Sequence, residues 1–210
     1  MSVPDDTNLT KYLDVFKEIG NIGAGNAASA LAGLLNRRIT MTVPDASAVP
    51  FSNIVGVLNG PETLVVGVLV DVSGGLNGYI LLVLGMEDAM AMVAQALGEE
   101  KRDSSAPDFK LNELELDAIG EIANILVGSF LSAISSFTGL SVKQSVPQMA
   151  IDMLGAIISI ATIEYGMIGD TVLFLKTQFN DLEGEISGHF FLIPDYNSYK
   201  ILLNALGLEG

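Results

Sequence analysis

The chain has no cysteine, no tryptophan and only one histidine, His189, among its 210 residues. The absence of cysteine excludes disulfides and thiolate metal sites. It also fits a reducing compartment, so we expect a cytoplasmic protein. A single histidine gives no basis for a His/Cys metal site or a Ser-His-Asp triad. The Glu-x-x-His motifs of di-iron bundles are also missing, and we therefore expect no metal site in this chain.

Positive charge is scarce as well. Lysine and arginine number 10 against 25 aspartates and glutamates, for a formal net charge of −15. Such a balance argues against binding to nucleic acid or to anionic membrane surfaces and favours partners with basic patches. Hydrophobic residues make up 50% of the chain and charged residues 17%, which predicts a large buried core.

No signal peptide is visible at the acidic, polar N-terminus MSVPDDTN. One uncharged run, between Glu121 and Lys143, is long enough to span a bilayer. This run contains Asn124, several serines and Thr138, and an acidic stretch precedes it. We interpret it as a buried helix of a soluble protein and predict no membrane insertion.

The chain does contain a pattern of polar residues that occurs twice. The first copy is Asp14, Glu18, Asn21 and Pro44, and the second is Asp117, Glu121, Asn124 and Pro147. Every member of the second copy lies 103 positions after its partner, as 117 − 14 and 147 − 44 illustrate. With a background frequency of roughly 5% for each residue type, a chance match at one offset is on the order of one in 10⁵. Duplication explains the pattern better.

In each copy the Asp, Glu and Asn are spaced i, i+4 and i+7, which places them within roughly 60° on one face of a helix. Gly25 and Gly128, four residues beyond the asparagines, continue the same stripe. A glycine in an exposed helix interior costs roughly 1 kcal/mol relative to alanine. Its presence in both copies suggests that a partner approaches the helix backbone closely there. We expect both stripes to be exposed, on two well separated helix faces.

The opposite face of each helix is apolar, and its positions also correspond at the offset of 103. The two sets are Leu13, Phe16, Gly20, Gly23, Ala27, Leu31 and Leu34, and Leu116, Ile119, Ala123, Leu126, Phe130, Ile134 and Phe137. Each helix is therefore predicted to bury its back and to present its polar stripe. The segment GNIGAGN at 20–26 follows no predicted strand and lacks the Lys-Ser/Thr of a phosphate-binding loop, so we assign its glycines to packing.

Hydrophobic periodicity and turn residues predict the elements of the first half. They are a helix from a cap at Asn8 or Thr10 to about Asn36, a strand at 39–43 stopped by Pro44, a short helix or turn at 50–58, hairpin strands at 63–72 and 78–84, and a helix at 86–97. Residues 99–110 are charged, contain serine and proline, and are predicted to form a linker.

The second half is predicted to repeat this order. Its elements are a helix capped by Asn112 with Glu115 as a capping box, a strand at 141–146 ending at Pro147, a segment at 152–165 that fits a helix or a buried strand, hairpin strands at 171–179 and 184–193, and a helix at 195–206. The hairpin strands LNGYILLVL and ISGHFFLIP correspond at an offset of 110, which makes His189 the counterpart of Tyr79 and an ordinary strand residue.

These elements predict an α/β fold of the α+β type. Two pseudo-symmetric repeats, at about 9–100 and 111–208, would join their strands into one mostly antiparallel sheet flanked by two long helices. Neither half is expected to close its own core. We therefore predict that residues 1–210 form a single domain.

At the two stripes the sequence resembles the CheC/CheX/FliY family of chemotaxis phosphatases. The family signature is Asp or Ser, three residues, Glu, two residues, Asn, twenty-two residues and Pro, and both copies match it without departure. The resemblance extends over residues 9–208, and two copies without an appended flagellar switch domain are similar to the two-site members of the family.

The resemblance implies hydrolysis of the aspartyl phosphate on the response regulator CheY. By the same resemblance, Glu18 and Glu121 would pair with the active-site lysine of the regulator. Asn21 and Asn124 would reach into its phosphorylation site and orient the attacking water.

The remaining motif residues have less defined roles. Asp14 and Asp117 either orient the glutamates or contact the regulator, and Pro44 and Pro147 complete the motif. The resemblance implies no cofactor belonging to this chain, because Mg²⁺ would be supplied by the bound regulator. It also implies a second partner, the receptor deamidase CheD.

An alternative of another class is a non-catalytic binding module of the flagellar switch or chemotaxis system, which binds CheY-phosphate or CheD without turnover. The middle domain of the flagellar switch protein FliM resembles this fold but lacks the Glu/Asn pair. The intact motifs favour the enzyme.

Overall fold

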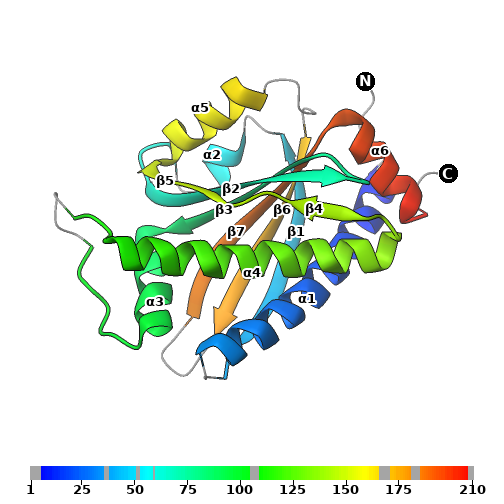
Figure 1. Cartoon of the computed structure of the whole chain (residues 1–210). Helices are drawn as coiled ribbons and strands as arrows, with labels where there is room; N and C mark the ends of the chain where they lie inside the picture. Colours follow the sequence, from blue (N-terminus) through cyan, green and yellow to red (C-terminus); the bar gives the residue numbers. More distant parts are fainter. Residues whose placement is uncertain are drawn as a thin grey trace.

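The computed structural model shows a seven-stranded antiparallel sheet with helices on both of its faces (Figure 1). It describes residues 6–35, 38–50, 53–58, 60–104, 109–165, 171–180 and 185–207. In chain order the elements are α1 (Asp6–Leu35), β1 (Thr40–Pro50), α2 (Ile54–Val57), β2 (Leu64–Gly74), β3 (Gly78–Gly85), α3 (Met86–Leu97), α4 (Glu113–Thr138), β4 (Val142–Gln144), β5 (Gln148–Met153), α5 (Leu154–Tyr165), β6 (Thr171–Asn180), β7 (Glu185–Pro194) and α6 (Tyr196–Ala205).

The two halves of the chain exchange strands within the sheet. The strand order is β1-β6-β7-β3-β2-β4, and β5 pairs with β2 on the same edge as β4. The first strand of each half thus pairs with the hairpin of the other half. At the centre Leu81 of β3 lies directly opposite Phe191 of β7, and these residues differ by the hairpin offset of 110. The predicted fold class, with its antiparallel sheet and two long helices, is confirmed.

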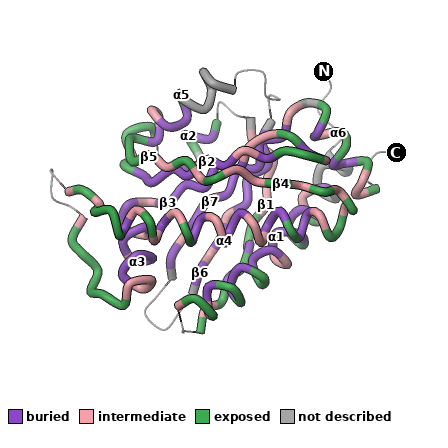
Figure 2. The backbone as a smooth tube through the Cα atoms, in the orientation of Figure 1, coloured by how far each residue is buried: buried purple, intermediate pink, exposed green. Residues whose placement is uncertain are grey.

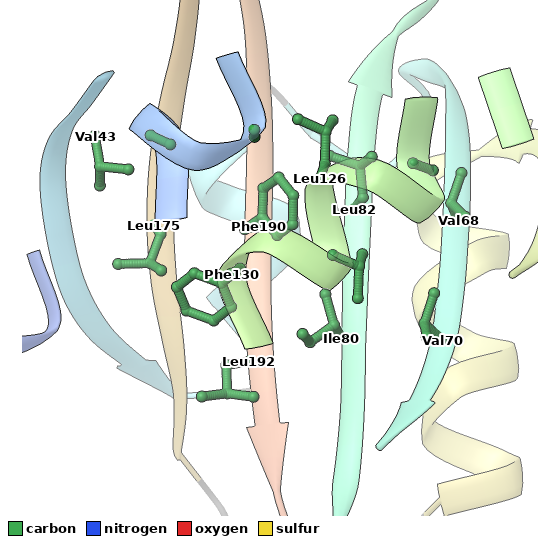
Figure 3. Close-up of a cluster of buried hydrophobic side chains, with 14 of the residues drawn as sticks. Val43, Val68, Val70, Ile80, Leu82, Leu126, Phe130, Leu175, Phe190 and Leu192 are labelled. Carbon is green, nitrogen blue, oxygen red and sulfur yellow. The ribbon is translucent and has the colours of Figure 1, made fainter. Parts of the chain in front are cut away.

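Side-chain alternation along the strands divides the core into two layers. On β2, Val66 and Val68 belong to the larger core under α1, α3, α4 and α6, whereas Val65 belongs to the smaller core under α2 and α5. In the larger core Phe130 of α4 packs on Phe190 of β7, with ring centroids 6.1 Å apart (Figure 3). Buried and exposed positions alternate along both long helices, as expected for helices with one apolar face (Figure 2).

Helix α4 is long and apolar enough to cross a membrane by length and composition. Half of its most apolar 18-residue window is buried inside the structure, against the sheet and α1. The apolar face that resembles a membrane span in the sequence is therefore a core face, as predicted. The absence of membrane insertion itself stays a prediction.

Several predicted boundaries agree with the structure. Asn112 caps α4 through the predicted capping box: its side chain accepts from the Glu115 N–H, and the Glu115 carboxylate accepts from the Asn112 N–H. Glu115 is buried and also forms an ion pair with Arg102 of the linker, at 2.6 Å. Helix α3 has the predicted limits and ends at Gly98 in the left-handed conformation (φ 68°). Residues 105–108 of the linker lie outside the described residues.

Other boundaries differ from the prediction. Helix α1 begins at Asp6, so the predicted caps at Asn8 and Thr10 are wrong, because several polar residues near a helix end can serve as its start. The predicted end at Asn36 lies outside the described residues. The ambiguous segment 152–165 divides into the end of β5 and the whole of α5.

Pro44 does not terminate its strand, contrary to the prediction, whereas the second strand is interrupted before Pro147. Strand β1 continues through Pro44, and its pairing with β6 contains a bulge between Thr42 and Asp45. The second strand stops after β4, bulges at 145–147 and resumes as β5. Both strands lie at the edges of the sheet, where a residue without an N–H group removes no hydrogen bond from the ladder.

Candidate functional site

The first stripe lies on α1, turned away from the core. Asp14, Glu18 and Gly25 are exposed, whereas Phe16 and Ile19 are buried. In the described part of the chain, no hydrogen bond or ion pair holds the Glu18 carboxylate. This carboxylate is therefore available to a cation brought by a partner.

Asn21, in the same stripe, is tied to the neighbouring strand β1. Its Oδ1 accepts from the Val43 N–H at 2.9 Å, and its Nδ2 donates to the Val43 carbonyl at 3.3 Å and to the Lys17 carbonyl at 3.0 Å. Both protons of the amide are thus used within the chain. The prediction that Asn21 is exposed is wrong, because this half-buried side chain links α1 to the residue before Pro44.

The second stripe lies on α4 and has the same pattern of exposure. Asp117 and Glu121 are exposed, and Ile119 and Ile122 are buried. Glu121, like Glu18, has no hydrogen bond or ion pair with any described residue. Gly128 follows on the stripe and is half-buried.

Asn124 is also half-buried, so the prediction of an exposed side chain is wrong here too. Its partner differs from that of Asn21. Gln144 of β4 donates from Nε2 to the Asn124 Oδ1 at 2.6 Å and to the Asn124 backbone carbonyl at 3.4 Å. No described residue accepts from the Asn124 Nδ2, which remains a free donor.

The two stripes lie at opposite edges of the sheet. Asn21 contacts β1, which is the first strand of the sheet order, and Asn124 contacts β4, which is the last. Pro44 is exposed and Pro147 half-buried, each at the bulge of its edge strand. The expected separation of the two faces therefore holds.

The glycines of α1 fall into two groups. A Cβ on Gly20 would lie 3.2 Å from the Val43 Cγ2, and one on Gly23 would lie 3.0 Å from the Phe130 Cα. These two glycines serve packing, as predicted for the segment 20–26. A Cβ on Gly25 would meet nothing within 4 Å, and one on Gly128 would meet only Gln144, at an ordinary 3.5 Å. The fold itself therefore does not require glycine on either stripe.

The other titratable side chains that the structure describes form no metal site. In the part of the chain that the structure describes, no group of three His, Asp or Glu side chains could hold a metal ion. His189 lies on β7 and stacks on Phe174, with ring centroids 5.8 Å apart. Burial, and next the positive charge of Lys176, lower the pKa of His189 below its usual value, which keeps the ring neutral at pH 7.

The sequence analysis did not identify Gln144 as a site residue. One feature of the sequence could have indicated it: Gln144 is polar, whereas Met41, its counterpart at the offset of 103, is apolar.

Comparison with solved structures identifies the fold. The Thermotoga maritima FliY structure superposes with a TM-score of 0.72 at 23% identity, over 98% of this chain and 98% of that one. A Borrelia burgdorferi CheX, solved in a complex with CheY, BeF₃ and Mg²⁺, superposes with a TM-score of 0.51 at 18% identity, over 86% and 97% of the two chains. This chain therefore shares the fold of these two proteins.

Sequence comparison identifies the family. A model of the CheC-like family matches residues 13–47, which include the first stripe and Pro44, and a model of chemotaxis phosphatase CheX matches residues 66–165. The CheY-P phosphatase CheC of Bacillus subtilis (strain 168) is 35% identical over 204 residues, which cover 94% of each chain. The chain therefore belongs to the CheC-like family of chemotaxis phosphatases.

Proposed function

We propose that this chain hydrolyses the aspartyl phosphate of CheY, with Glu18 and Asn21 in one site and Glu121 and Asn124 in the other. The observation that carries the proposal is the duplicated stripe. On each long helix an exposed carboxylate, which no described residue engages, precedes an amide by three residues. The CheY-P phosphatase at 35% identity supports the substrate. A cytoplasmic location, which the absence of cysteine fits, is part of the proposal.

The chemistry suits neutral amides and a peripheral carboxylate. An acyl phosphate is already activated, so positioning and electrostatic stabilisation can supply most of the acceleration. An amide can hold the water in line with phosphorus without adding negative charge beside the phosphoryl group. A carboxylate at the same place would repel it. Glu18 and Glu121 are therefore assigned to the lysine of the regulator, where their charge stabilises the complex.

The chain needs no metal of its own in this proposal. Mg²⁺ would come with the regulator and neutralise charge on the phosphoryl oxygens. The CheX structure with a TM-score of 0.51 was solved in a complex that contains CheY, BeF₃ and Mg²⁺. Gly25 and Gly128 would leave the helix backbone open to the regulator, and Asp14 and Asp117 would orient the glutamates or contact it directly.

Binding without turnover remains the second candidate, and one observation favours it for the first stripe. Both amide protons of Asn21 are committed to carbonyls of the chain itself, while no described residue engages the Glu18 carboxylate. That stripe can therefore hold CheY-phosphate more readily than it can act on it. CheD is proposed as a further partner on the resemblance alone.

The test is phosphate release from purified phosphorylated CheY, with and without this protein. Release above the spontaneous rate supports the enzyme, and saturable binding with unchanged release supports the binding module. Glu18→Gln/Glu121→Gln should raise KM by roughly 10- to 100-fold, the range for losing a hydrogen bond to a charged group. Glu62→Gln/Glu99→Gln removes the same charge at two exposed positions off the stripes and should leave KM unchanged.

A further inference from the structure

Gln144, the last residue of β4, fixes the amide of Asn124. The atom of Gln144 that faces Asn124 lies 2.6 Å from the Asn124 Oδ1 and 3.4 Å from its backbone oxygen. A backbone carbonyl can only accept, so the atom that faces it is the nitrogen Nε2. This donor in turn requires that Asn124 present Oδ1 to it. The Nδ2 of Asn124 is thereby left as the free end of the amide.

This arrangement leaves Gln144 incompletely bonded. Its Oε1 is buried and accepts no hydrogen bond within the described residues. A buried acceptor without a partner destabilises a fold. The matching residue of the first half is Met41 (144 − 103), which is buried and apolar. Packing alone therefore favours an apolar side chain at position 144, and the amide there needs another reason.

We propose that Gln144 is a positioning residue of the second site, an inference that rests on the proposed function. By engaging Oδ1, it holds Asn124 in the one orientation that offers Nδ2 to the phosphorylation site of the regulator. A preorganised N–H donor can bind the oxygen of the attacking water or of the phosphoryl group without reorganisation during the reaction. Met41 cannot perform this role, and the backbone of Val43 holds Asn21 instead.

The test uses the full chain in an Asn21→Ala background, so that only the second site can turn over. Gln144→Met installs the residue of the first half. Gln144→Glu keeps the size of the side chain but presents only acceptor oxygens, which should reverse the Asn124 amide. Both variants should lower kcat by roughly 10- to 100-fold, as expected when a catalytic group is misplaced. In Gln144→Met, which adds no charge, KM should change by less than about twofold, because Glu121 still provides the binding contact.

Stability separates this role from a structural one. Gln144→Met should have a free energy of unfolding equal to or higher than that of the Asn21→Ala parent protein, because it removes the unpaired acceptor. A structural role predicts lower stability with unchanged kcat. Gln148→Met, the same change at an exposed position of β5, is the matched control and should alter neither quantity. The side-chain amide resonances of Asn124 should shift in the two Gln144 variants and not in the control.

The possible failures are distinguishable. An active Asn21→Ala parent whose kcat is unaffected by both Gln144 variants would overturn the positioning role alone. The same holds if only KM changes, which would make Gln144 a docking residue. If the wild-type chain releases phosphate and the Asn21→Ala parent does not, the second site is not catalytic. The positioning role of Gln144 would then be excluded as well. If neither protein releases phosphate, the proposed function itself is wrong.

Discussion

Asn21 and Asn124 hold matched positions in the two halves of the chain, yet their amides are used differently. In the first half the backbone of β1 takes both ends of the amide. In the second half a side chain takes only Oδ1, and no residue that the structure describes accepts from Nδ2. The glutamates three residues earlier are exposed in both halves, and no described residue pairs with them. The two stripes are therefore alike as binding surfaces and unlike as candidate catalytic sites.

We expect one residue on the back of each helix to account for this difference. Gly20 leaves room for Val43, which is 3% exposed and lies against the place where a Cβ would be, at 3.2 Å. The matching residue of α4 is Ala123 (123 − 20 is again 103), which carries a methyl group where Gly20 has none. The counterpart of Val43, Val146, is 83% exposed, and the strand is broken around it. A valine that cannot approach the helix cannot offer its backbone to the asparagine.

The largest effect is expected when both amides are removed. Asn21→Ala/Asn124→Ala should reduce accelerated phosphate release by about 100-fold or more, the scale for losing groups that act in the transition state. Affinity for phosphorylated CheY should change little, because both glutamates remain. Phosphate release at saturating regulator measures the first quantity and a separate binding titration the second. Full turnover in the double variant would show that the asparagines are not catalytic.

The single variants compare the halves directly. Asn124→Ala should remove most of the turnover, because its Nδ2 is the free donor, and Asn21→Ala should remove less. Stability should follow the opposite order. Asn21→Ala leaves the Val43 N–H without its partner and should cost about 1–3 kcal/mol, more than Asn124→Ala. Phosphate release and denaturant unfolding provide the two rankings. Equal losses of turnover would mean that the bonds to Val43 open when the regulator binds.

The sequence predicted the fold and the location of the stripes because both depend on periodicity. The spacing from Asp117 to Asn124 places polar residues on one helix face whatever they contact. The partners of the asparagines depend on tertiary contacts that no local pattern encodes. Pro44 illustrates this limit. A proline is unfavourable in a central strand, but whether a strand is central or at an edge is decided by its pairing with a distant segment.

The exposure of Asn21 and Asn124 was wrongly predicted for the same reason. A helix face is polar where it meets water and also where it meets the backbone of an edge strand. The bulges at the motif prolines bring such backbone, or the side chain of Gln144, to the asparagines. The twenty-two residues between Asn and Pro are enough for the chain to finish the helix, turn and run back beside it as a strand. It does not reveal that the returning strand touches the stripe.

A smaller effect is expected from exchanging the residues that distinguish the halves. Gly20→Ala should push Val43 away from α1 and loosen its bonds to Asn21. In an Asn124→Ala background it should therefore raise the turnover of the first site several-fold, toward that of the second. Hydrogen exchange of the Val43 amide should become faster, which checks the cause independently. The reciprocal Ala123→Gly is the control and should not increase turnover at the second site. Unchanged exchange of the Val43 amide would rule out Gly20 as the source of the difference.

The smallest effect concerns the glycine of the first stripe. Alanine at position 25 meets no atom within 4 Å and should stabilise α1 by up to about 1 kcal/mol through helix propensity. Gly33 of the same helix is also exposed with open surroundings. It lies about 120° around the helix from Asn21, off the stripe. Both single alanine variants should therefore raise Tm by about 2–4 °C.

Only one of these variants should affect the regulator. In a Glu121→Gln/Asn124→Ala background, which leaves the first stripe to bind alone, Gly25→Ala should weaken the affinity for phosphorylated CheY a few-fold, whereas Gly33→Ala should not. The reason is steric: a methyl group at position 25 lies where the partner backbone or side chains would reach α1, beside Glu18 and Asn21. A binding titration with both variants decides the matter. Equal affinities would mean that the regulator does not approach α1 past Asn21, and that the repeated glycine has no role in docking.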